Sequence, residues 1–181
     1  MKILNLILLT PLLYLLIRLF ILEDVNDPIK YIYTLTGVSA TIILFVSVCF
    51  SLIKNKINLI RYRKSVGLYG FFYSLLHLLN FIVFDAQFDL IFIIEESIDK
   101  PFIYIGIFAF LIVLFMAFTS SKKLFRKFNK YHKFIYLSLV LITIHWVMAQ
   151  KSLDVYQLLY LGVCIIIISL KLKSFFAKSN H

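Results

Sequence analysis

Six apolar runs, each long enough to cross a lipid bilayer, dominate this chain of 181 residues. A spanning helix needs about 20 mainly apolar residues, because the hydrocarbon core is about 30 Å thick and a helix rises about 1.5 Å per residue. Such runs fold as helices because lipid offers no hydrogen-bond partner to the backbone. The sequence therefore predicts an all-α, polytopic membrane helix bundle with six transmembrane helices. The predicted spans are Ile3–Leu22, Thr36–Ile53, Gly67–Phe84, Phe102–Phe118, Tyr131–Ala149 and Val155–Leu172.

The charged residues alternate in sign from one loop to the next. Basic side chains follow the second and fourth spans and fill the C-terminal tail: Lys54, Lys56, Arg61, Arg63 and Lys64, then Lys122, Lys123, Arg126, Lys127, Lys130 and Lys133, then Lys171, Lys173 and Lys178. The other loops hold all nine acidic residues: Glu23, Asp24, Asp27, Asp85, Asp89, Glu95, Glu96, Asp99 and Asp154. Basic loops stay in the cytoplasm, so we expect both termini there. The net charge of +10 is spread over these loops rather than gathered in one patch, which argues against nucleic-acid binding.

Two shorter features refine this prediction. The first run is too long for a signal peptide and no small-residue cleavage site follows it, so we expect a retained helix that Pro11 kinks. The acidic and apolar stretch Asp89–Ser97 is too short to span, and we expect it to lie along the membrane interface or to cap the bundle. Cys49 and Cys164 lie inside apolar runs and indicate no disulfide.

Three of the four histidines, His77, His132 and His145, lie on predicted spans, and His181 is the last residue. Ionisable side chains are costly inside a bilayer and therefore indicate function, and neutral imidazole is the usual protein ligand of haem iron. Counted from the cytoplasmic ends of their helices, His77 lies ~15 Å deep and His145 ~20 Å deep. Two histidines at comparable depth on separate helices are arranged to bind one haem iron from both sides. Interhelical hydrogen bonding is the alternative for each histidine, and His132 at the inner face is also interpretable as an interfacial cation.

No catalytic residue is predicted. The carboxylates lie in outer loops without a paired geometry, and no dinucleotide or phosphate-loop motif is present. We therefore expect electrons to come from another protein or from a quinol.

Several short motifs resemble one family of membrane proteins. The run Arg61–Leu68, continuing through Tyr73 to His77, resembles the start of the third helix in the MsrQ (YedZ) family. The matches run from about Arg61 to Lys151 and include Lys100–Gly106, Ala117–Ser121, Tyr131–Tyr136 and Ile144–Trp146. That family supplies the haem-binding membrane subunit of a periplasmic protein-methionine-sulfoxide reductase system, and it belongs with the ferric-reductase-like membrane domains. The resemblance implies that residues 1–181 form one such domain.

The resemblance also implies a function. Electrons would pass from a cytoplasmic flavoprotein or quinol, through haem b, to a periplasmic molybdopterin-containing methionine-sulfoxide reductase, which supports repair of oxidised proteins. The protein would be a multi-pass component of the bacterial inner membrane, in contact with membrane lipid, and would not be a catalyst by itself. One haem b or two are implied, and the family also allows FMN.

The implied ligands are His77 and His145 for an outer haem and His132 for an inner one. Related domains usually carry two histidines on each of two helices, but here Lys64 stands thirteen residues before His77, with Arg63 beside it. Arg63 is therefore the predicted unusual partner of the inner haem. Two alternatives remain: a b-type cytochrome with another acceptor, and a transporter with structural histidines, for which the chain offers no buried carboxylate.

Overall fold

The computed structural model describes residues 2–52, 59–150 and 154–179, and this part of the chain is helical without strands. Ile53, Lys54, Lys56, Lys151 and His181, which entered the sequence predictions, lie outside it. The elements in chain order are α1 (Lys2–Phe20), α2 (Pro28–Leu52), α3 (Ile60–Asn80), the π-helix η1 (Phe81–Asp85), α4 (Leu90–Asp99), α5 (Pro101–Phe118), α6 (Lys122–Phe128), the 3₁₀-helix η2 (Asn129–Phe134), α7 (Ile135–Ala149) and α8 (Val155–Ser179).

Five helical segments of the described residues are long and apolar enough to cross a membrane: Lys2–Phe20, Pro28–Ser51, Arg61–Asp85, Pro101–Phe118 and Lys122–Ala149. These confirm the predicted all-α membrane bundle. The apolar stretch of α8, Gln157–Leu170, is shorter than these five. The sixth span, the cytoplasmic termini and the extent of the domain therefore stay predictions.

Two predicted helix starts were wrong. The second helix begins at Pro28 instead of Thr36, because proline suits the first turn of a helix, where its missing N–H is not needed. The third begins at Ile60 instead of Gly67, so that Arg61 and Lys64 lie inside its first turns. Long basic side chains can extend from the end of a spanning helix to the aqueous interface, and hydropathy alone ends the helix too early there.

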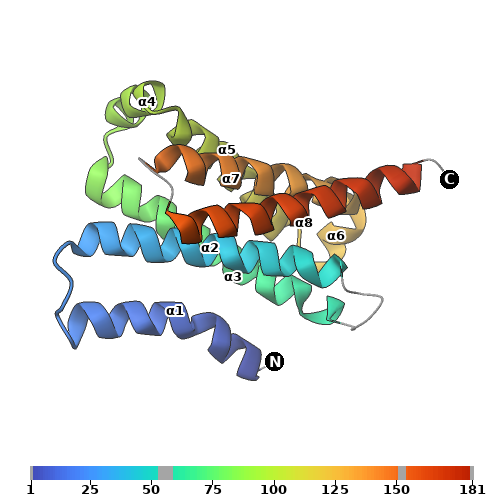
Figure 1. Cartoon of the computed structure of the whole chain (residues 1–181), viewed down its shortest axis with the longest axis horizontal. Coiled ribbons are helices and arrows are strands. Elements are labelled where there is room, and N and C mark those ends of the chain that lie inside the picture. Colours follow the sequence, from blue (N-terminus) through green and yellow to red (C-terminus); the bar gives the residue numbers. More distant parts are fainter. Residues whose placement is uncertain (1, 53–58, 151–153, 180–181) are drawn as a thin grey trace.

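Two antiparallel helix pairs, α2 with α3 and α5 with α7, form the body of the bundle (Figure 1). The first pair joins the second through contacts of α3 with α5 and of α2 with α7, and α8 packs on α7 and α2. One apolar core lies between α2, α5, α7 and α8, and includes Leu44, Val48, Val113, Leu139 and Cys164. A second core, around Ile43, Val66 and Tyr73, joins α1 to α2 and α3.

The short helix α4 lies across one end of the bundle (Figure 1). The Asp89 carboxylate caps it by accepting hydrogen bonds from the backbone N–H groups of Ile91 (2.8 Å) and Phe92 (3.2 Å). The helix packs on α5 at the end where α2 and α5 begin. Its apolar side chains Leu90, Ile91, Ile94 and Ile98 are exposed, so a position along the membrane interface stays a prediction.

Candidate functional site

A cavity of about 800 Å³ lies between the two helix pairs, near the end of the bundle that carries α4. Its size is typical of a small-molecule or cofactor site, ~300–1,000 Å³. The lining residues come from α2, α3, η1, α4, α5 and α7, and include both His77 and His145. The cavity is therefore a junction of the two helix pairs, and each pair contributes one histidine.

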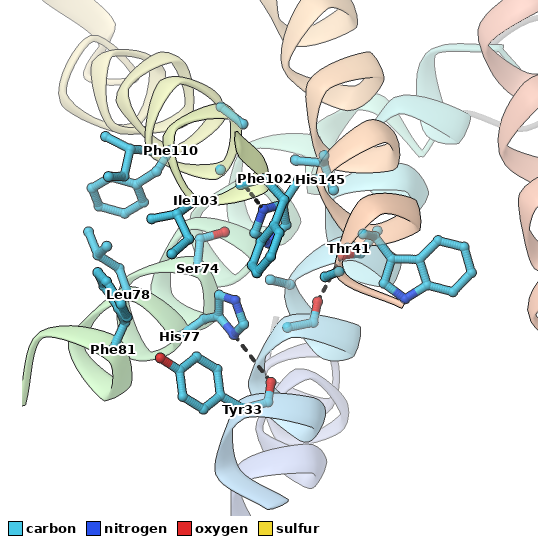
Figure 2. A pocket seen from close by; sticks show the side chains of 18 of the residues that line it. Tyr33, Thr41, Ser74, His77, Leu78, Phe81, Phe102, Ile103, Phe110 and His145 are labelled. Carbon is cyan, nitrogen blue, oxygen red and sulfur yellow. Dashed lines mark hydrogen bonds between the residues drawn. The ribbon is translucent and has the colours of Figure 1, made fainter. Parts of the chain in front are cut away.

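His77 of α3 and His145 of α7 lie next to each other in this cavity (Figure 2). Their ring centroids are 6.1 Å apart and their planes are nearly perpendicular, at 88°. The two residues are 68 positions apart in the sequence, so only the tertiary packing brings them together. The comparable depth that the sequence predicted for them agrees with this geometry, whereas their binding of haem stays a prediction.

Both imidazoles are held through the same ring atom. His77 Nδ1 lies 3.2 Å from the Tyr33 carbonyl oxygen, and His145 Nδ1 lies 2.6 Å from that of Phe102 (Figure 2). A carbonyl oxygen only accepts, so each Nδ1 carries the proton and donates it. In the neutral ring Nε2 is then an acceptor, and no hydrogen bond to either Nε2 is made within the described part of the chain. This arrangement is typical of metal-binding histidines, whose second nitrogen is fixed by an outer partner.

The walls of the cavity combine small and aromatic side chains. Small side chains face it from all four helices of the two pairs: Gly37, Ala40, Thr41, Ser74, Gly106, Ala109 and Ala149. Flat aromatic side chains complete the walls: Phe81, Phe84, Phe92, Phe102, Phe110 and Trp146. Small residues let a rigid ligand approach the backbone, and aromatic faces pack on a planar one. The shape therefore suits a flat macrocycle.

The residues fit a haem on chemical grounds also. Two imidazoles on opposite sides of one metal ion, each bound at about 2 Å, place their ring centroids about 6 Å apart, which agrees with the measured 6.1 Å. Among the described residues, no three His, Cys, Asp or Glu side chains gather as a metal site. Two histidines alone leave most ligand positions of an iron unfilled, and a tetrapyrrole supplies four. The histidine pair therefore suits a metal ion whose other ligands come from a macrocycle.

Charged side chains mark the end of the cavity beneath α4. The Tyr33 hydroxyl donates a 2.7 Å hydrogen bond to Asp85 Oδ2, and Lys100 Nζ lies 2.6 Å from Glu96 Oε2. All four residues line the cavity. Sequence reasoning missed Tyr33 because the second span was predicted to begin at Thr36. It treated Asp85 only as a loop charge, although a carboxylate directly after a span was a signal for the rim of a site.

His132 lies apart from this pair. It belongs to η2 and is not among the residues that line the cavity. Its Nε2 is 3.0 Å from the Thr119 hydroxyl, which itself donates to the Phe115 carbonyl (2.8 Å). Nε2 of His132 is therefore engaged with Thr119, so this nitrogen could bind a metal only if that hydrogen bond were lost.

The predicted span Tyr131–Ala149 lies within the apolar helical segment Lys122–Ala149, but His132 and His145 do not share one regular α-helix. The α-helix begins at Ile135, and the residues before it form the 3₁₀-helix η2. Arg63, in the first turns of α3, lies close enough for its charge to act on His132, and its carbonyl accepts a hydrogen bond from Ser47 (3.2 Å). Both His132 and Arg63 lie outside the cavity that His77 and His145 line.

Comparison with known proteins adds independent information. Residues 53–149, more than half of the chain, match the family described as "Ferric reductase like transmembrane component". The chain is 30% identical over 143 residues to the protein-methionine-sulfoxide reductase heme-binding subunits MsrQ of Brucella ovis and Brucella suis, and 29% identical to that of Brucella anthropi. Each alignment covers 76% of this chain and 65% of the relative's length. These relatives confirm the MsrQ resemblance that the motifs indicated.

Proposed function

This chain belongs to the ferric reductase like transmembrane family, and from that premise we propose that it is a haem b electron-transfer subunit with one haem between His77 and His145. The observation that carries the proposal is the imidazole pair, 6.1 Å apart in a cavity of about 800 Å³, with each Nδ1 on a backbone carbonyl. In this role the protein is a multi-pass membrane component that passes electrons and catalyses no reaction by itself.

The chain's own residues prepare the site. His77 and His145 would hold the iron through Nε2, and the haem, when bound, supplies one-electron redox chemistry. The Nδ1–H groups donate to Tyr33 and Phe102, which keeps both rings in one tautomer and orientation and raises their basicity toward a metal. The mainly apolar and aromatic walls would surround the bound group with a surface of low polarity, which also tunes a redox potential.

The proposed electron path follows the loop charges. Electrons enter from a cytoplasmic flavoprotein or quinol at the basic face and leave at the acidic face to a periplasmic molybdopterin-containing methionine-sulfoxide reductase. The name of the relatives, heme-binding subunits of a protein-methionine-sulfoxide reductase, supports this acceptor. The bacterial inner membrane is the location this path requires. FMN rests on the resemblance alone.

A second haem at His132, with Arg63 as its partner, stays a separate prediction. It requires His132 to give up the hydrogen bond to Thr119. His132 and Arg63 otherwise lie at the inner face, where the proposed donor would approach.

The test is a reduced-minus-oxidised haem spectrum of the detergent-purified protein, with the haem-to-protein ratio measured in native membranes. We expect a low-spin b-type spectrum in the wild type. His77→Ala and His145→Ala should each lose most of this spectrum while the protein still accumulates in the membrane.

His132→Ala is the matched control, and it also tests the number of haems. If the protein binds one haem, the haem-to-protein ratio should be near one in both the control and the wild type. If it binds two, the ratio should be lower in the control. A full haem complement in both of the first two variants would refute the pairing, and a wild type without haem would favour the transporter alternative.

A further inference from the structure

The two histidines are held by two local structures that are built in the same way. In each antiparallel helix pair, the helix that runs toward the basic end carries an aromatic residue followed four positions later by glycine: Tyr33 and Gly37 on α2, Phe102 and Gly106 on α5. The returning helix carries the histidine, His77 on α3 or His145 on α7. We call each set of aromatic residue, glycine and histidine a histidine seat.

The three contacts of a seat recur in both. The carbonyl of the aromatic residue accepts the Nδ1–H bond, at 3.2 Å from Tyr33 and 2.6 Å from Phe102. The aromatic ring contacts the imidazole, with centroids 5.3 Å apart for Tyr33 and 5.8 Å for Phe102. The Nδ1–Cε1 edge of the imidazole then lies directly against the glycine backbone.

The distance from each glycine to the neighbouring imidazole shows whether a larger residue would fit there. A Cβ atom on Gly37 would lie 3.0 Å from His77 Cε1 and 3.1 Å from Nδ1. A Cβ atom on Gly106 would lie 2.7 Å from His145 Nδ1 and 2.8 Å from Cε1. Helix geometry explains why the contact is so close. In an α-helix the carbonyl of residue i also accepts the N–H of residue i+4, so the imidazole that shares this carbonyl must lie over residue i+4.

The other glycines differ in kind. A Cβ atom on Gly70 would meet Leu44 Cδ2 at 2.6 Å, which indicates close packing of α3 on α2. Gly162 has nothing within 4 Å, and Gly67 meets only the Ser47 hydroxyl at 3.4 Å. Among the glycines of this chain, only Gly37 and Gly106 contact a histidine ring.

We propose that Gly37 and Gly106 are the positioning residues of the two haem ligands: each glycine lets the Nδ1–Cε1 edge of the imidazole lie against the backbone, so that the carbonyl four residues earlier fixes Nδ1–H and directs Nε2 into the cavity. The proposal rests on the proposed haem function. It makes the site a clamp of two equivalent halves, although α2–α3 and α5–α7 carry no repeat that we detect elsewhere in the sequence. The common element is the aromatic–x–x–x–glycine pattern.

The effect of an added methyl group depends on whether the ring is free. In the haem-free protein the imidazole is the far end of a flexible side chain and turns away at the cost of its Nδ1–H hydrogen bond alone. When Nδ1–H is held by the carbonyl and Nε2 by iron, the ring cannot turn without straining one of the two bonds. The substitution therefore acts on haem retention and on ligand geometry, while it leaves the haem-free fold intact. Outer partners of metal-binding histidines typically change metal affinity by ~10–100-fold.

The experiment compares Gly37→Ala and Gly106→Ala with two control variants. Gly70→Ala introduces an even shorter contact, but with a leucine, and Gly162→Ala introduces none. Each purified protein is measured for the rate of haem transfer to a soluble haem scavenger and for the electron paramagnetic resonance spectrum of the ferric low-spin state. We expect about tenfold faster haem loss and shifted g-values in both seat variants, with the larger effect at Gly106. The Gly162 variant should match the wild type in haem loss and in its spectrum. The folded fraction of the Gly70 variant should match it as well.

The outcomes separate this inference from the proposed function. A wild type without haem would overturn both. A haem-bound wild type with unchanged haem loss and spectra in both seat variants would overturn the seats and leave the haem function standing. If Gly106→Ala does not accumulate in membranes, the same substitution is made in the His145→Ala background, where the colliding ring is absent. Recovery of the protein there supports the seat, and continued failure assigns Gly106 to helix packing instead.

Discussion

Tyr33 connects the histidine pair to the charged end of the cavity. Its carbonyl accepts the His77 Nδ1–H bond, while its hydroxyl donates to Asp85 Oδ2 at 2.7 Å. Phe102 makes the equivalent carbonyl bond to His145 without a hydroxyl. The two seats therefore hold their rings alike but differ in charge, because only the His77 seat is linked to a carboxylate.

At this scale we predict that Asp85→Asn raises the reduction potential of the proposed haem. An anion beside the site stabilises the ferric form more than the ferrous form, and its removal favours reduction. A tenfold change in that equilibrium corresponds to about 59 mV for one electron, and we expect a shift of this order in a redox titration. Tyr33→Phe is the control for geometry, since the carbonyl that holds His77 remains and the haem content should not fall. An unchanged potential in Asp85→Asn would show that this carboxylate does not act on the haem.

Among the helices, α1 is hydrogen-bonded to α3 through one side chain. The Tyr73 hydroxyl, on a residue with no exposed surface, donates to the Leu8 carbonyl (2.8 Å) and accepts from the Leu12 N–H (3.2 Å). These two backbone groups would bond each other in a regular helix. The insertion lies at Pro11, which has no N–H of its own, and Figure 1 shows that α1 bends along its length. The predicted kink thus serves as the docking point of α1 on α3.

We predict that Tyr73→Phe weakens the attachment of α1. Loss of the hydroxyl removes the two hydrogen bonds that join α1 to α3, each with a net contribution of about 0.5–1.5 kcal/mol, and it lets the Leu8 carbonyl and the Leu12 N–H bond each other instead. Hydrogen exchange within α1 and its cleavage by protease should both become faster, while the spectrum of the proposed haem stays as in the wild type. Tyr104→Phe, at an exposed position, is the matched control. Equal exchange rates in the two variants would mean that packing alone holds α1.

The loop charges predict the orientation of the whole molecule in the membrane. The number of transmembrane helices depends on whether α8 crosses it. Five segments meet the length and hydropathy of a span, and the apolar part of α8 is shorter. Reporter fusions after Asp27, Asp99 and Asp154 should read outside and a fusion after Lys127 inside. A reporter at the C-terminus should read inside if α8 crosses the membrane. An outside reading there reduces the count to five spans, and a reversal at Asp99 and Lys127 would invert the proposed electron path.

The sequence by itself determined the helices and the level of the histidines. A segment that crosses a bilayer must be apolar over a set length, and its backbone must form its hydrogen bonds within the helix, because lipid offers no partner. The fold class can therefore be predicted from local composition. Counting residues also predicted that His77 and His145 share a level, which their neighbouring rings agree with, although the helix starts used for the count differ from Ile60 and Ile135 in the structure. Helix ends were less predictable, as Pro28 and Ile60 show, because proline and long basic side chains extend a helix beyond its apolar run.

Only the tertiary structure decided how the site is built. The bonds of His77 to Tyr33 and of His145 to Phe102 join residues 44 and 43 positions apart, and they depend on how each helix is rotated about its axis. The depth of a residue in the membrane does not determine how its helix is rotated about its axis. The role of Gly37 or Gly106 can be recognised only when the neighbouring imidazole atom is known. The same holds for His132, whose 3₁₀ turn and bond to Thr119 came from the packing of η2 on the end of α5 and not from its spacing to His145.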